Sequence, residues 1–258
     1  MRLDERRQLA ATHRKAHQFT EAVALLTDLW DDEADCTDGA SLLHCLRKLE
    51  QVREARALAD HLYDKCPHHP WACLETIWAY DLVIAKAPEE TPLSEIINLA
   101  ERVISLRPDT LPLSRSVFAV LKRAKTGGKW GIVLEWVDRL SPDSISDEPM
   151  VFEGREGWSR RAIWYNYKVN AELEVGNYSS AENFGRLAAA LFPKQGKFFQ
   201  RLHAKALCSL ENLGEGLNIY EHLCRNPKAD WWLRHEYAYF LKKSGQIQKA
   251  RTEMSQAA

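Results

Sequence analysis

The strongest constraint on this sequence is a recurring interval between prolines that follow apolar segments. Prolines of this kind are separated by 41, 34, 51 and 34 residues, standing at Pro67, Pro108, Pro142, Pro193 and Pro227. A period near 34 residues is typical of arrays of stacked helical hairpins. The two longer intervals have visible causes, because residues 86–92 and 141–157 contain prolines and acidic residues that predict insertions between helices.

A second set of positions follows the same period. A small residue opens an amphipathic segment in most units, and these residues are Ala22, Ala55, Ala181, Gly216 and Ala250. Pro67 follows Ala55 by 12 residues, and Pro193 follows Ala181 by 12 residues. A small side chain there lets the two helices of one hairpin approach closely. Because each hairpin keeps an apolar face that it cannot bury alone, neighbouring hairpins must stack.

The sequence therefore predicts an all-α fold, a solenoid of about seven helical hairpins. Its first helices are expected near residues 5–16, 40–49, 70–86, 112–125, 158–175, 196–211 and 230–244. We expect repeats one to four in residues 1–142, an acidic linker with proline and glycine in residues 143–157, and repeats five to seven in residues 158–258. The last repeat is incomplete, which predicts that the natural polypeptide continues or that a partner covers this end.

This pattern resembles the tetratricopeptide repeat family, whose repeat has a small residue at its position 20 and a proline at its position 32. The resemblance covers nearly the whole chain, and Tyr80 and Gly245 fit the family's tyrosine and turn glycine. Two units depart from it, because position 20 holds Ile96 in the third and Trp130 in the fourth. A broader class of helical-hairpin solenoid also fits. The resemblance implies a right-handed superhelix whose first helices line a concave surface.

Composition restricts the functional classes. Lys and Arg number 35 against 36 Asp and Glu, so net charge gives no reason to expect nucleic acid or an anionic membrane as partner. No apolar run approaches ~18 residues, and no secretory signal follows the charged N-terminus. Because the six cysteines form no C-x-x-C pair, we expect reduced thiols and a cytoplasmic protein.

Motifs for catalysis or metal binding are weak. The segment 66–73 holds two cysteines and two histidines, but its spacing favours histidines in a turn between repeats over a zinc site. Residues 125–129 look like part of a phosphate-binding loop, yet Arg123 stands where that motif needs glycine. No nucleophile is paired with a base in a known motif. We therefore predict a protein that is not an enzyme and that needs no cofactor or metal.

The resemblance also selects candidate binding residues, because the family's concave-face positions hold mostly basic residues here. Three basic pairs, Arg47-Lys48, Lys122-Arg123 and Lys242-Lys243, lie in the last turns of their helices and suit the helix dipole. Amide and cationic side chains in units five to seven would suit a carboxylate, as in tetratricopeptide domains that grip a C-terminal carboxylate. The predicted partner-binding residues are Asn166, Asn170, Lys197, Gln200, Arg201, Trp232, His235 and Tyr239.

The sequence thus predicts a protein-protein interaction scaffold or adaptor. Its basic concave groove would bind an acidic or carboxylate-bearing segment of a partner protein. Two alternatives stay open: binding of RNA or single-stranded nucleic acid in the same groove, or a regulatory domain of a larger enzyme or multi-protein complex. The acidic stretch within residues 141–157 is expected to be a surface loop, a hinge, or a mimic that occupies the groove.

Overall fold

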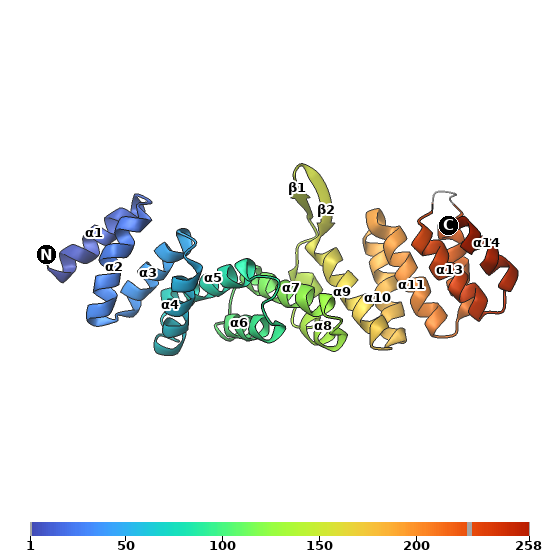
Figure 1. The fold of residues 1–258 in the computed structure, drawn as a ribbon, viewed down its shortest axis with the longest axis horizontal. Coiled ribbons are helices and arrows are strands. Elements are labelled where there is room, and N and C mark those ends of the chain that lie inside the picture. Colours follow the sequence, from blue (N-terminus) through green and yellow to red (C-terminus); the bar gives the residue numbers. More distant parts are fainter. Residues whose placement is uncertain (1, 226–228, 258) are drawn as a thin grey trace. The chain divides into compact units, whose positions relative to one another are not determined.

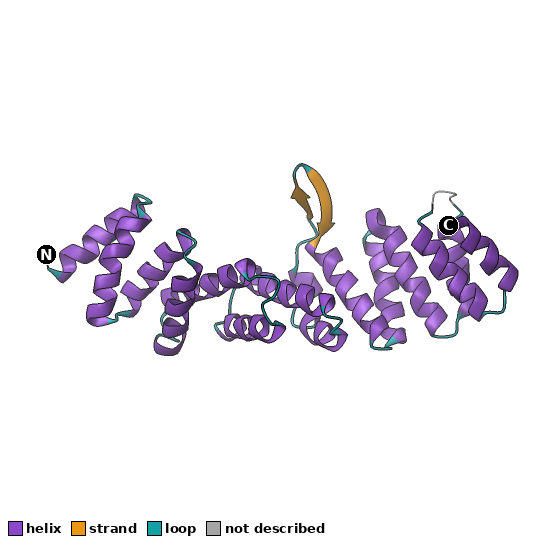
Figure 2. Ribbon diagram, viewed as in Figure 1, coloured by secondary structure: helices purple, strands orange, loops and turns teal. Residues whose placement is uncertain are grey.

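The computed structural model describes residues 2–225 and 229–257. Helices dominate the chain, and they follow one another as antiparallel pairs (Figure 1, Figure 2). The chain divides into two compact units, Met1–Arg123 and Ala124–Ala258, and each unit is described by itself. None of the described helices is both long and apolar enough to cross a membrane.

Unit 1 consists of three helix pairs and most of a seventh helix. Within it α1 packs on α2, α3 on α4, and α5 on α6, while α3 also contacts α5. The bounds are α1 Leu3–Lys15, α2 Phe19–Glu33, α3 Cys36–Lys48, α4 Val52–Lys65, α5 Pro70–Lys86, α6 Leu93–Ser105 and α7 Thr110–Thr126.

Unit 2 begins with the end of α7 and contains seven further helices among its described residues. Here α8 packs on α9, α9 on α10, α11 on α12, and α13 on α14. The bounds are α8 Trp130–Val137, β1 Pro149–Phe152, β2 Arg155–Ser159, α9 Arg160–Glu174, α10 Tyr178–Leu191, α11 Gly196–Ser209, α12 Leu213–Cys224, α13 Trp231–Lys243 and α14 Ile247–Ala257. Two short 3-10 turns, Pro142–Ser144 and Pro193–Gln195, precede the hairpin and α11.

The small residues of the repeat lie where two helices meet. Ala22, Ala55 and Ala181 are completely buried. At Gly216 a Cβ atom would stand 2.4 Å from the Sγ of Cys208, so even a methyl group would clash. Ile96 is also buried at the corresponding position of the third repeat. The predicted helical-hairpin architecture is therefore confirmed, and it is a tetratricopeptide-like one. Pro227, the last proline of the period, lies outside the described residues.

The expected acidic linker contains a β-hairpin that the sequence analysis missed. Strand β1 pairs with β2 in antiparallel register, with Val151 opposite Glu156. The two turn residues, Glu153 and Gly154, both have positive φ angles of 50° and 76°. Positive φ at both central residues matches the twist of a tight hairpin, and glycine adopts it without strain. The acidic composition of this segment favours a loop, and composition alone gives no indication of a turn between two strands.

A disulfide joins Cys36 to Cys66, which corrects the expectation that all cysteines are reduced. Cys36 begins α3 and Cys66 follows α4, so the bond closes the open end of this antiparallel helix pair. A search for neighbouring cysteines could not find it, because the two residues are 30 apart in sequence. Within residues 2–225 and 229–257, no group of three or more His, Cys, Asp or Glu side chains is placed to hold a metal ion. His69 instead accepts a hydrogen bond from the amide of Ala72 and caps α5.

Candidate partner-binding site

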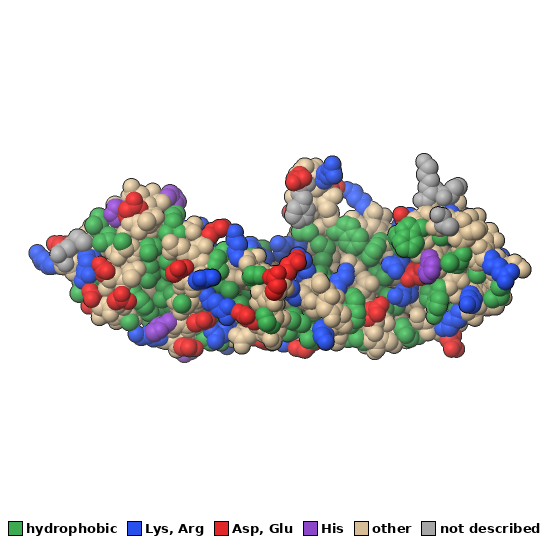
Figure 3. Space-filling model, in the orientation of Figure 1, with side chains coloured by type: hydrophobic (Ala, Val, Ile, Leu, Met, Phe, Trp, Pro, Cys, Tyr) green, Lys and Arg blue, Asp and Glu red, His purple; other side chains and the backbone are tan. Residues whose placement is uncertain are grey.

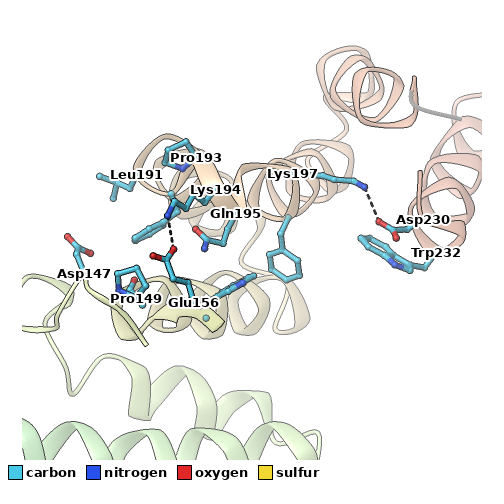
Figure 4. A pocket seen from close by; sticks show the side chains of 15 residues that line it. Asp147, Pro149, Glu156, Leu191, Pro193, Lys194, Gln195, Lys197, Asp230 and Trp232 are labelled. Atoms are coloured by element: carbon cyan, nitrogen blue, oxygen red, sulfur yellow. Dashed lines mark hydrogen bonds and ion pairs between the residues drawn. The ribbon is translucent and has the colours of Figure 1, made fainter. Parts of the chain in front are cut away.

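Unit 2 carries a hollow of about 670 Å³ between the β-hairpin, the start of α11 and the start of α13 (Figure 4). We call it the hairpin hollow. Its apolar lining includes Trp158 from β2, Phe198 from α11 and Trp232 from α13. Charged side chains stand around this lining, namely Asp147, Glu156, Lys194, Lys197 and Asp230. Hydrophobic side chains also gather on the surface near the hairpin (Figure 3).

Trp158 and Phe198, which form the aromatic wall of the hairpin hollow, pack against a buried aromatic residue. The ring centroids of Trp158 and Phe198 are 5.0 Å apart in an edge-to-face contact. Both rings also contact Phe199, at 5.5 Å from Trp158 and 5.7 Å from Phe198. Because Phe199 is completely buried, it holds the other two rings in place. The hollow is therefore a preformed apolar surface.

Two lysines at the hollow are paired with carboxylates of the same chain. Lys194 Nζ lies 2.8 Å from Glu156 Oε2, and Lys197 Nζ lies 2.9 Å from Asp230 Oδ2 (Figure 4). The lysine side chains are 73% and 51% exposed, and their partners are similarly exposed. Hydrogen bonding with Lys194 lowers the pKa of Glu156. Ion pairs this exposed contribute about 0–1 kcal/mol, so a carboxylate from another protein can replace either partner.

Arg201 is held much more firmly than the two lysines. Its Nε and Nη2 atoms donate to Glu236 Oε2 and Oε1 at 2.6 and 2.9 Å. Tyr220 donates a further hydrogen bond to the same carboxylate, and the guanidinium lies 5.0 Å from the ring of Trp232. Burial acts to lower the pKa of Arg201, but hydrogen bonding and charge attraction with Glu236 raise it overall. Arg201 therefore has its carboxylate inside the protein.

The structure brings only some of the predicted binding residues together. Lys197 and Trp232 both line the hairpin hollow, and Arg201 stacks on Trp232. Asn166 and Asn170 form a pair within α9, where Asn170 Nδ2 donates to the Oδ1 and the backbone oxygen of Asn166. The expected convergence of both amides with Lys197 and Arg201 on one carboxylate is not what the hydrogen bonds describe, because Asn170, Lys197 and Arg201 donate to separate partners.

The remaining predicted residues lie at other places in unit 2. Gln200 lines a separate hollow of about 490 Å³ formed with α10 and α12. His235 and Tyr239 line a third hollow, of about 540 Å³, between α13 and α14. The sequence predicts one groove because these residues share the concave-face positions of the repeat. In the structure the neighbouring helices separate them into different hollows.

Several cations of the predicted basic groove are paired with carboxylates from the next repeat. Each such pair joins a cation on one first helix to an acid 28–35 residues away on the next, as in Arg7–Asp38, Arg47–Glu75, Lys197–Asp230 and Arg201–Glu236. Counting only the basic positions overlooked these acids. A search for carboxylates 28–35 residues after each cation would have found them.

The sequence analysis also missed Trp158, Phe198, Lys194 and Glu156 as members of the hollow. Glu156 was expected in a loop and Trp158 at the start of a helix over residues 158–175, but both belong to strand β2, and the helix begins at Arg160. The alternation of Glu156 and Trp158 along one short segment was the available signal, because such alternation is typical of a strand.

Comparison with known proteins finds only distant structural similarities. No known family profile matches the chain, and no curated protein matches it. A STAND signal-transduction ATPase with a tetratricopeptide repeat sensor from Pyrococcus horikoshii is 12% identical, with a TM-score of 0.47 over 97% of this chain and 40% of that one. A tetratricopeptide repeat protein from Parabacteroides merdae is 11% identical, with a TM-score of 0.41 over 99% of this chain and 91% of that one.

The TPR2AB domain of yeast Sti1, solved with pHSP90, is also 11% identical, with a TM-score of 0.33 over 99% of this chain and 98% of that one. All three similarities are low. The assignment of the fold therefore rests on the helix pairs of this chain itself and on their buried small residues. These define a helical-repeat protein of tetratricopeptide-like fold.

Proposed function

We propose that this protein is an interaction scaffold and that its hairpin hollow binds an extended segment of a partner protein. The segment would place a bulky apolar side chain against Trp158 and Phe198 and a carboxylate beside Lys197. One observation carries the proposal: the hollow joins a fixed aromatic wall to two exposed lysines whose own partners are weakly held. The proposed partner segment still carries a carboxylate, as the sequence predicts, but its proposed binding site lies beside the hairpin.

The energetics favour such a segment. Burying one large apolar side chain contributes about 1.5–3 kcal/mol. A partner carboxylate that replaces Asp230 on Lys197 exchanges one exposed ion pair for another that is shielded by the bound segment. Arg201 contributes by positioning, because its guanidinium supports the ring of Trp232. Asn166, Asn170, Gln200, His235 and Tyr239 lie outside the hairpin hollow and are not part of this proposal.

Nucleic acid is less well matched to the same surface. A phosphate backbone needs several cations whose charge is available. Arg201 is held by Glu236, so the hollow offers two exposed lysines and not a row of cations for successive phosphates. A scaffold of this kind can equally serve within a larger enzyme or complex, because the hollow acts through binding alone.

Selection from a displayed library of random peptides tests the proposal. The library is selected on the wild-type protein, and the enriched peptides are then measured against Phe198→Ala and Lys197→Glu by fluorescence anisotropy. We expect peptides with a large apolar residue near Asp, Glu or a free C-terminus, and an affinity loss of about tenfold in either variant. Lys129→Glu, an exposed lysine of unit 2 away from the hollow, is the matched control.

Two results would contradict the proposal. One is a set of enriched peptides without acidic character. The other is equal binding by the wild-type protein, Phe198→Ala and Lys197→Glu. A single-stranded RNA oligonucleotide measured in parallel at low and physiological salt separates the nucleic-acid alternative, because its affinity would fall steeply with salt.

A further inference from the structure

A second apolar hollow lies between α13 and α14, away from the hairpin. We call it the terminal hollow, and its volume is about 540 Å³. Three of its apolar side chains are unusually exposed: Tyr239 at 61%, Ile247 at 43% and Met254 at 45%. Three basic side chains accompany them, namely His235, Lys242 and Arg251. Exposed apolar side chains that cluster and are bordered by charge mark interaction sites.

In the helix pair α13 and α14, basic side chains outnumber the acidic side chains that could pair with them. Residues 230–257 contain five Lys or Arg and three Asp or Glu. All three acids are engaged elsewhere, Asp230 by Lys197, Glu236 by Arg201 and Glu253 by Arg234 at 2.7 Å. Among residues 2–225 and 229–257, no carboxylate pairs with Lys242 or Arg251. The terminal hollow thus differs from the hairpin hollow, whose lysines both have an acid of the same chain.

The repeat period indicates which kind of element fits this surface. Lys197 and Arg201 on α11 are covered by α13, which supplies Asp230 at its start and Glu236 within it. One period of 34 residues after Arg201 stands His235, which is exposed. The face of α13 that carries His235 and Lys242 is therefore equivalent to the part of α11 that carries Arg201 and Cys208, which α13 contacts through Glu236 and through a shared apolar core. What covers the α11 face is a helix that presents apolar side chains together with carboxylates.

We infer that the terminal hollow docks an acidic amphipathic helix of a partner protein. The apolar stripe of that helix would lie on Tyr239, Ile247 and Met254. Glutamate or aspartate side chains along its edges would pair with Lys242 and Arg251. Laying one apolar helix face into such a groove is a common mode of recognition, in which the flanking charges set orientation and partner choice. This inference is independent of the hairpin hollow.

Two synthetic helical peptides test it on the full chain. Both carry leucines along one face and alanines elsewhere, and they differ only in having glutamates or lysines beside the leucines. We expect the glutamate peptide to bind at least about tenfold more tightly than the lysine peptide, measured by fluorescence anisotropy. Lys242→Glu combined with Arg251→Glu should weaken the glutamate peptide by at least about tenfold and strengthen the lysine peptide.

The controls separate a local site from general charge attraction. Lys15→Glu with Lys48→Glu reverses two exposed cations in unit 1 and should leave the affinity within about twofold. Lys242→Gln with Arg251→Gln repeats the test without adding acids near the end of α13, and circular dichroism confirms that each variant is folded. Tyr239→Ser removes apolar surface from an exposed position and should also weaken binding.

Four outcomes would overturn the inference: equal affinity for the two peptides, no binding of either, no effect of the Lys242 and Arg251 changes, or an equal effect of the Lys15 and Lys48 changes. Sedimentation of the protein alone covers one more case. Dimers that dissociate on reversal of Lys242 and Arg251 would assign the hollow to a second copy of this chain instead of an acidic helix. None of these outcomes bears on peptides selected for the hairpin hollow.

Discussion

Arg201 and Glu236 form a two-point ion pair between consecutive first helices, with donor-acceptor distances of 2.6 and 2.9 Å. Their side chains are only 21% and 16% exposed. The pair also holds Tyr220 through a hydrogen bond and supports the ring of Trp232. A cation that looked available to a partner is therefore part of the contact that joins two repeats.

Removal of either member of this pair should destabilise unit 2. Glu236→Ala leaves Arg201 partly buried without its carboxylate, and we expect a loss of about 1.5–3 kcal/mol in the free energy of unfolding. Urea unfolding followed by circular dichroism measures it. Lys197→Ala is the control, because its exposed pair with Asp230 should contribute less than about 1 kcal/mol. Equal losses in the two variants would show that the Arg201–Glu236 pair is no stronger than a surface contact.

The buried alanine of the fifth repeat should not tolerate a larger side chain. Ala181 is completely buried where α10 meets its neighbours, so Ala181→Leu should lower stability by about 1–3 kcal/mol through overpacking. Ala190→Leu places the same side chain at an exposed point of the same helix and should change stability by less than about 0.5 kcal/mol. If Ala181→Leu leaves the urea midpoint unchanged, the close approach of helices at this position is wrong.

Reduction of the disulfide should weaken unit 1. Cys36 and Cys66 close a loop with a sequence separation of 30, and the chain-entropy account gives such a bond about 3–4 kcal/mol. Thermal unfolding with and without dithiothreitol measures the effect. Cys36→Ser with Cys66→Ser should be as unstable as the reduced protein and insensitive to the reductant. A wild-type protein that unfolds identically in both conditions would rule out a stabilising bond.

The same disulfide makes the compartment testable. Protein disulfides are rare in the cytosol, where thiols are kept reduced. The cytoplasmic location expected from the sequence and an intact Cys36–Cys66 bond therefore lead to different results. Rapid alkylation of thiols in intact cells, followed by mass spectrometry, reports whether both cysteines are labelled. Labelling of both supports the cytoplasm, whereas protection of both supports an oxidising compartment.

Acid should destabilise unit 1 through Glu75. Burial acts to raise the pKa of this carboxyl, but hydrogen bonds and charge attraction from His44 and Arg47 lower it below the ordinary value of 4.5. Because the pKa is lower in the folded state, the contribution of Glu75 is present above pH 4.5 and is lost as the pH falls through the folded value. Glu75→Gln should therefore show a shallower loss of stability below pH 4.5 than the wild-type protein.

Urea unfolding at a series of pH values measures this dependence. Glu54→Gln, an exposed position on α4, should keep the wild-type slope. Identical slopes for Glu75→Gln and the wild-type protein would mean that the contacts with His44 and Arg47 do not favour the ionised carboxylate.

The helices could be predicted well because their signals are local. The expected first helix over residues 70–86 coincides with α5, and those at 5–16 and 196–211 differ from α1 and α11 by one or two residues. Pro70 occupies the first turn of α5, where its missing N–H costs nothing, and Gly245 follows α13 with a φ of 81°. Each of these positions depends on residues within one turn of the chain.

The candidate site could be predicted only in part. Lys197 and Trp232 were identified from their repeat positions, and both line the hairpin hollow. Trp158 was not, because its role depends on a hairpin whose turn at Glu153 and Gly154 was overlooked. Asn166 and Asn170 were expected to face a partner, yet one turn of helix brings them within hydrogen-bond distance of each other.

The sequence by itself determined the repeat: a period near 34 residues, a small residue inside each hairpin, and helices that must stack to bury their apolar faces. Only the tertiary structure decided which charges are available, because Arg201 meets Glu236 across 35 residues and Cys36 meets Cys66 across 30. The physical reason is the separation in sequence between the residues that each feature brings together. Helix formation and close packing of a hairpin depend on neighbours along the chain, whereas an ion pair, a disulfide or a hollow depends on what the next element places opposite.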